Sequence, residues 1–556
     1  MKETLRSLIV SALDKIAAQK QWPADLDLGG FILEEPNNPQ FGHLASNAAM
    51  VLAKKVGLKP RDLADLIVQT IGQGSELIES MEVAGPGFIN FRFSNKFWAK
   101  TLENVLSLGP DFGRDNAPKG RVLVEYVSAN PTGPLHVGHG RGAALGDALA
   151  RILSFVGYDV GCEYYVNDAG RQMRILGNSV LVRLNELMGK KVEIPADFYR
   201  GDYITDIARE AAPSLGEGFD KLPENEKVEI LTGHAIGVIM AGIKKDLRDF
   251  KIRHDTWFSE KSLYENHLVE KSFDFLEKQG HTYHKDGALW FKSTAFGDDK
   301  DRVLVKSDGE MTYFASDIAY HKEKFDRGYD QLIDIWGADH HGYIPRVKAA
   351  VSALGRDPED FSVVLVQLVN LLRDGKAVNM STRRAEFVTL EEVVAEVGAD
   401  AARIIFLTRS HESALDFDLE LAKSQSRDNP VFYVQYVCAR VNSLLGKALE
   451  AKPDPEAAKL PVDLSLLSAN EEIEIVKTLS TFPETLLTVA KRLEPHLLTS
   501  YLSTLAKLFH QYYGAYRLVD EDNWPLTRAR LELAKAVKQV TAIGLDLLGV
   551  TAPEKM

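Results

Sequence analysis

The chain has few cysteines, no long apolar run and no excess of basic residues, and each shortage excludes a class of protein. Its 556 residues include two cysteines, Cys162 and Cys438, which excludes a disulfide framework and a cysteine-based zinc site. The most apolar stretch, 363–372, is interrupted by Gln367 and Asn370 and is too short to span a bilayer. The net charge of −13 argues against indiscriminate nucleic-acid binding, although it allows a local basic groove.

The remaining composition is that of an ordinary globular protein. Apolar residues make up 45% of the chain and charged residues 26%. The length implies about three or four domains. The pattern of residues 1–19 predicts an amphipathic helix with interspersed acidic residues rather than a signal peptide. We therefore expect a monomeric cytoplasmic protein with no membrane partner.

Residues 121–156 predict a strand, a turn and a helix, and the rest of the chain is organised around them. The segment 122–127 is short, apolar and β-branched, as a buried parallel strand is. Two prolines and a glycine at 131–134 interrupt regular structure, and from about His139 apolar residues recur at helical spacing. A glycine-containing turn of this kind presents free backbone N–H groups at a helix N-terminus, where phosphate binds.

Two histidines enter this helix three residues apart. His136 and His139 are predicted to lie on one side of it, and Gly138 between them lets a ligand approach the backbone. Protonated or donor imidazoles here could hold the oxygens of a phosphoryl group as charge builds on it. A half-built metal site is the alternative, but the sequence offers no third and fourth ligand nearby. We therefore assign no metal ligands.

The motif His136-Val137-Gly138-His139 resembles the H-I-G-H signature of the class I aminoacyl-tRNA synthetases. More narrowly, VEYVSANPTGPLHVGHGRG and EYYVNDAGRQ resemble the bacterial arginyl-tRNA synthetases, as do WGADHHGY, MSTRRAEFVTL and GLDLLGVTAPEKM farther along the chain. The resemblance covers essentially the whole sequence. It implies a ligase that uses ATP and Mg²⁺ to join L-arginine to tRNA(Arg) through an arginyl-adenylate, releasing AMP and diphosphate.

The predicted fold class is α/β, with a Rossmann-like catalytic domain between two smaller domains. Alternating strands and helices over 119–425 predict a parallel sheet, an α+β domain precedes it over 1–108, and an all-α bundle follows over 426–556. By resemblance, about 171–300 is a helical connective insertion and the bundle is a DALR-type anticodon-binding domain. The N-terminal domain would contact the elbow of the tRNA, or would be a structural appendage.

The bundle is predicted as four amphipathic helices, over 430–449, 471–490, 493–516 and 527–548. The first helix carries aromatic side chains and Arg440, which could stack on or pair with RNA. The alternative is that Phe432 and Val437 belong to the core of the bundle, which is the commoner role of such side chains.

The second signature of the family, K-M-S-K-S, holds the leaving pyrophosphate with its lysines, and this chain departs from it. Asn379 and Thr382 stand where the lysines are expected. Four residues of this loop are assigned to the catalytic site by resemblance: Met380, Ser381, Thr382 and Arg383. Arg383 and Arg384 could supply the charge, because guanidinium binds phosphate well, and Lys376 is another candidate. The alternative is a surface loop with solvated arginines.

Recognition of arginine requires acidic side chains that can receive a guanidinium group. Tyr313 and Asp317 are spaced one helical turn apart, and by resemblance they form this receptor, although such a pair alone would suggest a solvated helix face. By resemblance, Ser128 and Asn130 bind the polar head of the amino acid. Glu125 would add a second carboxylate near the guanidinium.

A second cluster of polar residues follows the predicted strand 332–336. Ligands of doubly wound folds bind at the carboxyl ends of strands, so we assign Gly337, Asp339 and His340 to the ATP site. A metal site is the alternative, but adjacent residues on a strand cannot all point at one ion.

Three other functions remain open beside the arginine ligase. They are a class I synthetase for another amino acid, a small nucleotidyltransferase that never meets RNA, and a synthetase-like protein without activity. A nucleotidyltransferase has no need of the helices after Glu420, and intact His136, Gly138, His139 and Asp317 argue against an inactive protein.

Overall fold

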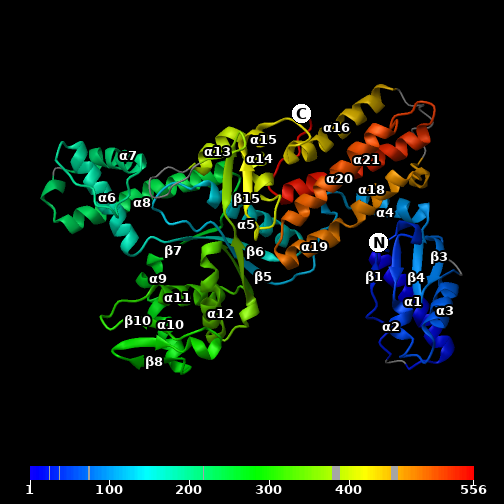
Figure 1. Cartoon of the computed structure of the whole chain (residues 1–556), viewed down its shortest axis with the longest axis horizontal. Helices are drawn as coiled ribbons and strands as arrows, with labels where there is room; N and C mark the ends of the chain where they lie inside the picture. The colour runs from blue at the N-terminus through cyan, green and yellow to red at the C-terminus, as the bar shows by residue number, and fades with distance from the viewer. Residues whose placement is uncertain (24–25, 37, 73–74, 217, 379–387, 452–460) are drawn as a thin grey trace.

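The computed structural model describes residues 1–556 except 24–25, 37, 73–74, 217, 379–387 and 452–460. Its N-terminal part is a four-stranded antiparallel sheet in the order β1-β2-β4-β3, with helices packed against it. Its elements are α1 (Lys2–Lys20), β1 (Leu33–Glu34), β2 (Leu44–Ser46), α2 (Ala48–Leu52), α3 (Pro60–Gly72), β3 (Ile78–Ala84) and β4 (Phe88–Phe93). Helix α4 (Asn95–Leu108) then leads away and packs against the C-terminal helices (Figure 1).

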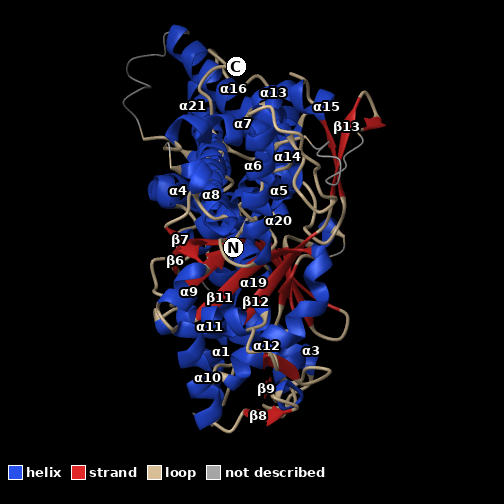
Figure 2. Cartoon of the chain, turned by 90° about the vertical axis from the view of Figure 1, so that its left-hand side faces the viewer, coloured by secondary structure: helices blue, strands red, loops and turns tan. Residues whose placement is uncertain are grey.

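The centre of the molecule is a five-stranded parallel sheet in the order β12-β11-β5-β6-β7, as the alternating sequence pattern predicts. The strands are β5 (Arg121–Glu125), β6 (Asp159–Val166), β7 (Thr256–Ser259), β11 (Gln331–Gly337) and β12 (Phe361–Val366). Because parallel neighbours need crossover connections, helices lie on both faces of the sheet. Figure 2 shows the sheet between α5 (Val137–Phe155) and α14 (Ala399–Phe406) on one side and α11 (Tyr313–Asp326) and α12 (Ile344–Ala353) on the other.

Helix α5 follows β5 and is buried along almost its whole length. Its small residues allow this burial: a Cβ at Gly146 would lie 2.2 Å from Cγ of Tyr126, and one at Gly140 would lie 2.7 Å from Leu390. The helix therefore packs directly against the strand that precedes it, which places its N-terminus at the carboxyl edge of the sheet.

The segment predicted as a helical insertion, about 171–300, contains strands as well as helices. It begins with α6 (Arg171–Leu187), α7 (Asp202–Ala211) and α8 (Glu224–Asp249), but then supplies β7 to the central sheet and β8 (Thr282–Lys285) and β9 (Ala288–Phe291) to a smaller one. A four-residue strand such as β7 is too short to leave a periodic signal, so the sequence did not separate it from the helices.

The remaining elements complete the catalytic region around the sheet. Strands β8, β9 and β10 form an antiparallel sheet. Strands β14, β13 and β15 form a mixed sheet, in which β13 is antiparallel to β14 and parallel to β15. The bounds are α9 (Lys261–Glu265), α10 (Leu268–Lys278), β10 (Arg302–Val305), β13 (Val369–Arg373), β14 (Lys376–Ala377), α13 (Leu390–Val397), β15 (Leu415–Asp418) and α15 (Leu419–Lys423).

The C-terminal part is a bundle of five helices in the described residues, where the sequence pattern predicts four. They are α16 (Pro430–Glu450), α18 (Asn470–Ser480), α19 (Phe482–Arg492), α20 (His496–Ala515) and α21 (Trp524–Leu547). The predicted helix 471–490 is divided because Pro483 lies in the first turn of α19, where its missing N–H costs nothing, and it ends α18 before it. Across the described chain, no helix combines the length and the apolarity needed to cross a membrane.

Candidate active site

A cavity of about 990 Å³ opens at the carboxyl edge of the central sheet, over the ends of β5, β11 and β12. Eight of the residues predicted for the site line it: Ser128, Asn130, His136, Gly138, His139, Gly337, Asp339 and His340. Gln367 and Leu368, which follow β12, form part of the wall and were not predicted. Residues from two halves of the sequence, separated by about 200 positions, thus meet where the strand order reverses.

The turn after β5 holds two non-glycine residues in the left-handed region of backbone space. Val127 has φ 72° and Ser128 has φ 41°, a conformation that is costly for a β-branched residue. The hydroxyl of Ser128 donates to Glu125 Oε1 at 2.8 Å and accepts from the Tyr165 backbone N–H at 3.1 Å. These two bonds hold the strained turn and fix Ser128 at the mouth of the cavity.

The insertion helices hold the far side of the same turn. Asn130 Nδ2 donates to Gln172 Oε1 of α6 at 2.9 Å, and the Tyr203 hydroxyl of α7 donates to the Thr132 carbonyl at 2.7 Å. The position of Asn130 therefore depends on tertiary contacts as well as on the turn itself.

The two histidines form a stacked pair at the N-terminus of α5. His136 is the N-cap residue, and its Nδ1 accepts from the Gly138 N–H at 3.1 Å. His139 Nδ1 accepts from the His136 N–H at 3.2 Å, and the ring centroids lie 3.7 Å apart. A Cβ on Gly138 would lie 2.9 Å from His136 Cε1, so glycine is required for this stacking. Since both Nδ1 atoms accept, each neutral ring carries its hydrogen on Nε2.

Burial keeps His136 and His139 uncharged by lowering the pKa of each imidazole. Burial, reinforced by the neighbouring His136, lowers the pKa of His139 to about 3, and burial also lowers the pKa of His136. Both rings are therefore neutral near pH 7, and each can offer an Nε2 hydrogen without carrying a positive charge. Of the two alternatives that the sequence left open, protonated or donor imidazoles, the structure favours the donors.

Asp317 lies on α11, beside the cavity rather than in its wall. Its carboxylate accepts a hydrogen bond from the Tyr343 hydroxyl, and burial raises the pKa of Asp317. Tyr313, one turn earlier on α11, is 65% exposed at the start of the helix. Neither of these two predicted residues lines the cavity.

Glu260 is an acidic residue of this region that the sequence analysis missed. It follows β7 directly, is only 4% exposed, and its Oε2 atom is buried without a hydrogen-bond partner in the described structure. Burial, with a further contribution from the charge of Asp317, raises the pKa of Glu260 to about 7. The available signal was its position at the carboxyl end of a parallel strand, but β7 itself had not been recognised.

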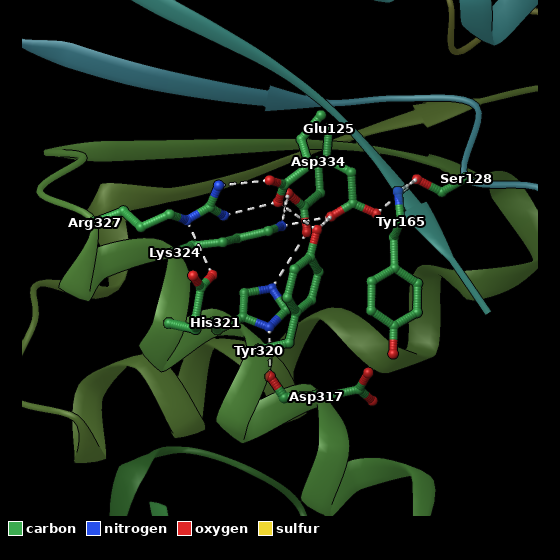
Figure 3. A network of polar contacts seen from close by, with 11 residues as sticks. Glu125, Ser128, Tyr165, Asp317, Tyr320, His321, Lys324, Arg327 and Asp334 are labelled. Atoms are coloured by element: carbon green, nitrogen blue, oxygen red, sulfur yellow. Dashed lines mark hydrogen bonds and ion pairs between the residues drawn. The ribbon is translucent and has the colours of Figure 1, made fainter. Parts of the chain in front are cut away.

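A buried ion network connects this acidic region with the cavity (Figure 3). Lys324 of α11 is fully buried and donates to Glu125 of β5 and, at 2.8 Å, to Asp334 of β11. The Tyr320 hydroxyl also contacts Glu125 Oε2, at 2.9 Å, and Glu163 Oε1, at 2.7 Å. With Ser128 on its other oxygen, Glu125 already has three side-chain partners, which favours a role in holding the Ser128 turn over direct contact with a guanidinium.

The network carries more acid than base. Arg327 forms a two-point contact with Glu163 of β6, at 2.6 and 2.9 Å, and His321 contacts Asp334 at 3.2 Å. Together with Lys324, Arg327 balances two of the three carboxylates on the strands, which are those of Glu125, Glu163 and Asp334. The surplus negative charge makes the neighbouring space, between Asp317 and Glu260, favourable for a cation.

The loop residues Met380, Ser381, Thr382 and Arg383 lie outside the described residues, as does Arg384. Lys376, the further candidate, begins β14 and is exposed. Within the described chain no group of three or more histidine, cysteine or acidic side chains is arranged to hold a metal ion.

Three family models match this chain in succession. Residues 3–93 match the arginyl tRNA synthetase N terminal domain, residues 101–417 the catalytic domain of the class I (R) tRNA synthetases, and residues 434–556 the DALR anticodon binding domain. The chain belongs to the arginyl-tRNA synthetases of class I. The fold class predicted from the sequence is confirmed.

Relatives and solved structures support this membership over the full length. The chain is 52% identical over 528 residues to the arginine–tRNA ligase of Nitratidesulfovibrio vulgaris strain DP4, covering 94% of this chain and 95% of the relative. It is 49% identical to that of Desulfovibrio desulfuricans, over 100% of this chain and 99% of the relative. A Campylobacter jejuni structure described as a putative arginyl tRNA synthetase is 36% identical, covers 83% of this chain and 100% of its own, and has a TM-score of 0.75.

Removing the lysine at the centre of the network should strongly destabilise this synthetase. Lys324→Met leaves the carboxylates of Glu125 and Asp334 buried without their common cation, and we expect the free energy of unfolding to fall by about 3–5 kcal/mol. Urea unfolding followed by circular dichroism measures this decrease in the free energy of unfolding. The control is Lys322→Met, which breaks an exposed ion pair with Asp326 on the same helix and should cost about 1 kcal/mol or less. An equal decrease in the free energy of unfolding of the two variants would contradict a larger contribution from the buried contacts of Lys324 than from the exposed ion pair.

Proposed function

We propose that two adjoining sites share the arginine–tRNA ligase reaction of this family: a nucleotide cavity and an acidic receptor. The cavity at the sheet edge would bind ATP, and the region between Asp317 and Glu260 would bind the arginine side chain. The observation that carries the proposal is the convergence of the stacked histidines, the strained Ser128 turn and the segment 337–340 around one cavity.

In the first step, a carboxylate oxygen of arginine attacks the α-phosphorus of ATP. A new P–O bond forms, the bond to the β-phosphate breaks, and diphosphate leaves. His136 and His139 would donate from Nε2 to the phosphate oxygens, on which negative charge increases in the transition state. Fixed neutral donors at a helix N-terminus suit this task, because the backbone dipoles there also favour negative charge. Gly337, Asp339 and His340 would bind the nucleotide.

In the second step, a hydroxyl of the terminal ribose of tRNA attacks the carbonyl carbon of the adenylate, and AMP leaves. Mg²⁺ would enter with ATP as part of the substrate. Asp339 is the one carboxylate among the described lining residues, so the phosphates themselves would supply most of the ligands of the ion.

The arginine substrate would lie with its guanidinium against the two buried carboxylates. Asp317 supplies one carboxylate and Glu260 the other, and the surplus acid of the network below strengthens their attraction for a cation. Ser128 and Asn130 would bind the ammonium and carboxylate end of arginine. Because both residues line the histidine cavity, the reacting carboxylate would then lie in that cavity. Tyr313 would cover the receptor from its exposed position on α11.

The helical bundle would bind the anticodon of tRNA(Arg). Arg440 lies between the rings of Tyr436 and Tyr513, 4.6 Å from each centroid, and contacts His510 at 3.0 Å. A cation held between aromatic rings on a half-buried surface supports stacking of RNA bases. Val437 on the same helix is fully buried, so it belongs to the core.

The other domain assignments remain predictions. The N-terminal domain, 1–108, would contact the elbow of the tRNA, and the limits 119–425 and 426–556 would separate catalysis from anticodon binding. We expect a monomer in the cytoplasm, where its two unpaired cysteines suit a reducing compartment. In the loop after β14, Arg383 and Arg384 would hold the leaving diphosphate, with Met380, Ser381 and Thr382 forming the rest of that contact.

The test of this function is charging of total tRNA with each of the twenty labelled amino acids in the presence of ATP and Mg²⁺. We expect charging with arginine alone. Charging with a different amino acid would place the protein in another specificity class. No charging by a folded protein that still binds tRNA would support an inactive synthetase-like protein.

The shifted pKa of Glu260 predicts how arginine binding depends on pH. In the free protein Glu260 is largely protonated below its pKa of about 7, and a guanidinium binds only its ionised form. Arginine affinity should therefore rise from pH 6 to pH 8, and binding below pH 7 should release a proton. Titration calorimetry in buffers of different ionisation enthalpy measures that proton. In Glu260→Gln the proton release should vanish, and its persistence would assign the titration to another group.

A further inference from the structure

Arg403 of α14 is a fully buried arginine that does not line the cavity, and its guanidinium contacts three different parts of the fold. It donates to the carboxylate of Asp147 on α5, to the carbonyl of Leu548 at 2.9 Å and to the carbonyl of Phe250 at 3.2 Å. Leu548 is the C-cap residue that follows α21 of the helical bundle, and Phe250 is the C-cap residue that follows α8 of the insertion. Helix α14 packs against α5 and α16 (Figure 1).

The guanidinium of Arg403 is tightly packed against the end of the bundle. Gly549, with φ +68°, lies so close to the guanidinium that a Cβ there would be 2.2 Å from Arg403 Nη2. One turn earlier on α14, Asp400 accepts from the Thr551 backbone N–H at 3.2 Å and from Gln435 Nε2 of α16 at 3.1 Å. Helix α14 is thus bonded both to α16 and to the segment that follows α21.

The same guanidinium reaches the helix that carries the histidines. Asp147 lies eight residues after His139 on α5, which corresponds to about 12 Å along a rigid helix axis. Near the N-terminus of α5, two residues after His139, Arg141 donates to the carbonyl of Gln367 in the cavity wall at 2.9 Å. A displacement of α5 at Asp147 would therefore move the histidines and the adjoining wall of the cavity together.

We propose that Arg403 is a positioning residue that couples the helical bundle to the histidine-bearing helix α5. Its contacts with Leu548 and Gly549 depend on the position of α21, and its contact with Asp147 fixes the axial position of α5. A tRNA held by the bundle would in this way bias the geometry of the phosphate donors. The inference rests on the roles proposed above for His136 and His139.

A guanidinium is needed for this role because it offers five N–H donors in a rigid plane. Lysine at position 403 would keep the charge beside Asp147 but could not also reach the Leu548 and Phe250 carbonyls. Arg403→Lys therefore removes the coupling while it leaves the buried carboxylate neutralised.

The experiment compares Arg403→Lys with Gly549→Ala, which disturbs the same contact from the bundle side. Charging of total tRNA with arginine is measured at a temperature well below the melting temperature of each variant. We expect kcat to fall at least threefold in each variant, with KM for ATP and arginine and Kd for tRNA within twofold of the parent. The control, Arg151→Gln, removes the other ion pair of Asp147 and a longer contact, at 3.5 Å, with the Asp546 carbonyl of α21, but it leaves the contacts of Arg403 in place. If Arg403 carries the coupling, this variant should keep the kcat of the parent.

The double variant tests whether the two substitutions break one linkage. If Arg403 carries the coupling, Arg403→Lys combined with Gly549→Ala should lower kcat no further than the stronger single variant, because interacting sites are not additive. Three results would each overturn the proposal. The first is a double variant in which the two decreases in kcat multiply, and the second is a folded single variant whose kcat stays within threefold of the parent. The third is a decrease in the kcat of Arg151→Gln as large as that of the other two variants. If Arg403→Lys does not fold, Gly549→Ala decides alone. A parent protein that fails to charge with arginine would instead count against the proposed function.

Discussion

Replacing His139 with asparagine is expected to lower kcat for arginyl-adenylate formation by about 10²–10³-fold, the usual loss when a fixed transition-state donor is removed. The amide oxygen of asparagine can stand where Nδ1 stands and keep the hydrogen bond from the His136 backbone N–H. Only the Nε2 donor is then lost, so the helix cap is preserved. ATP–diphosphate exchange in the presence of arginine and tRNA measures this step.

Two companion variants make the result specific. His139→Gln carries an amide nitrogen near the position of Nε2 and should recover part of the activity that His139→Asn loses. His284→Ala, at an exposed histidine on β8, should match the parent. Exchange at the parental rate in His139→Asn would show that this imidazole does not hold the reacting phosphate.

Replacing Asp317 with asparagine is expected to raise KM for arginine by about 10²-fold or more. Loss of one partner in a buried charge contact costs about 2–5 kcal/mol, and here the bound guanidinium would keep only Glu260. The KM for ATP should stay within about twofold, because Asp317 does not line the cavity. Steady-state exchange with each substrate varied in turn separates the two constants.

Citrulline, a neutral analogue with the shape of arginine, sharpens this test. The parent protein should bind arginine far better than citrulline, and Asp317→Asn should narrow that difference, because the lost interaction is one of charge. Asp326→Asn, at an exposed carboxylate on the same helix, is the matched control and should change neither constant. A shift confined to the KM for ATP would move Asp317 from the receptor to the nucleotide site.

Local sequence patterns were sufficient to predict the fold class and most of the cavity. The apolar run before Ser128, the prolines after it and the spacing of His136 and His139 are features of a few neighbouring residues, and a strand–turn–helix follows from them. The cluster at 337–340 was predicted in the same way, because it follows a strand of recognisable length. The resemblance to the synthetases added the roles of these residues, which spacing does not contain.

Some assignments depended on contacts between residues distant in sequence. Glu260 was missed because β7 has only four residues and becomes a strand by pairing with β6. From the sequence, Glu125 was expected to supply a carboxylate near the guanidinium. In the structure it is paired with Lys324, which lies 199 positions later. A contact between two residues so far apart in sequence leaves no periodic pattern in the segment around either of them.

The sequence by itself thus determined the order of the domains, the parallel sheet and the histidine motif at a helix N-terminus, since each follows from local propensity and spacing. Only the tertiary structure decided that both histidines are neutral donors, that Glu260 titrates near neutrality and that Arg403 joins three elements. The physical reason is that burial and charge–charge contacts set the pKa and the partners of a side chain. Both depend on which distant segments pack around it.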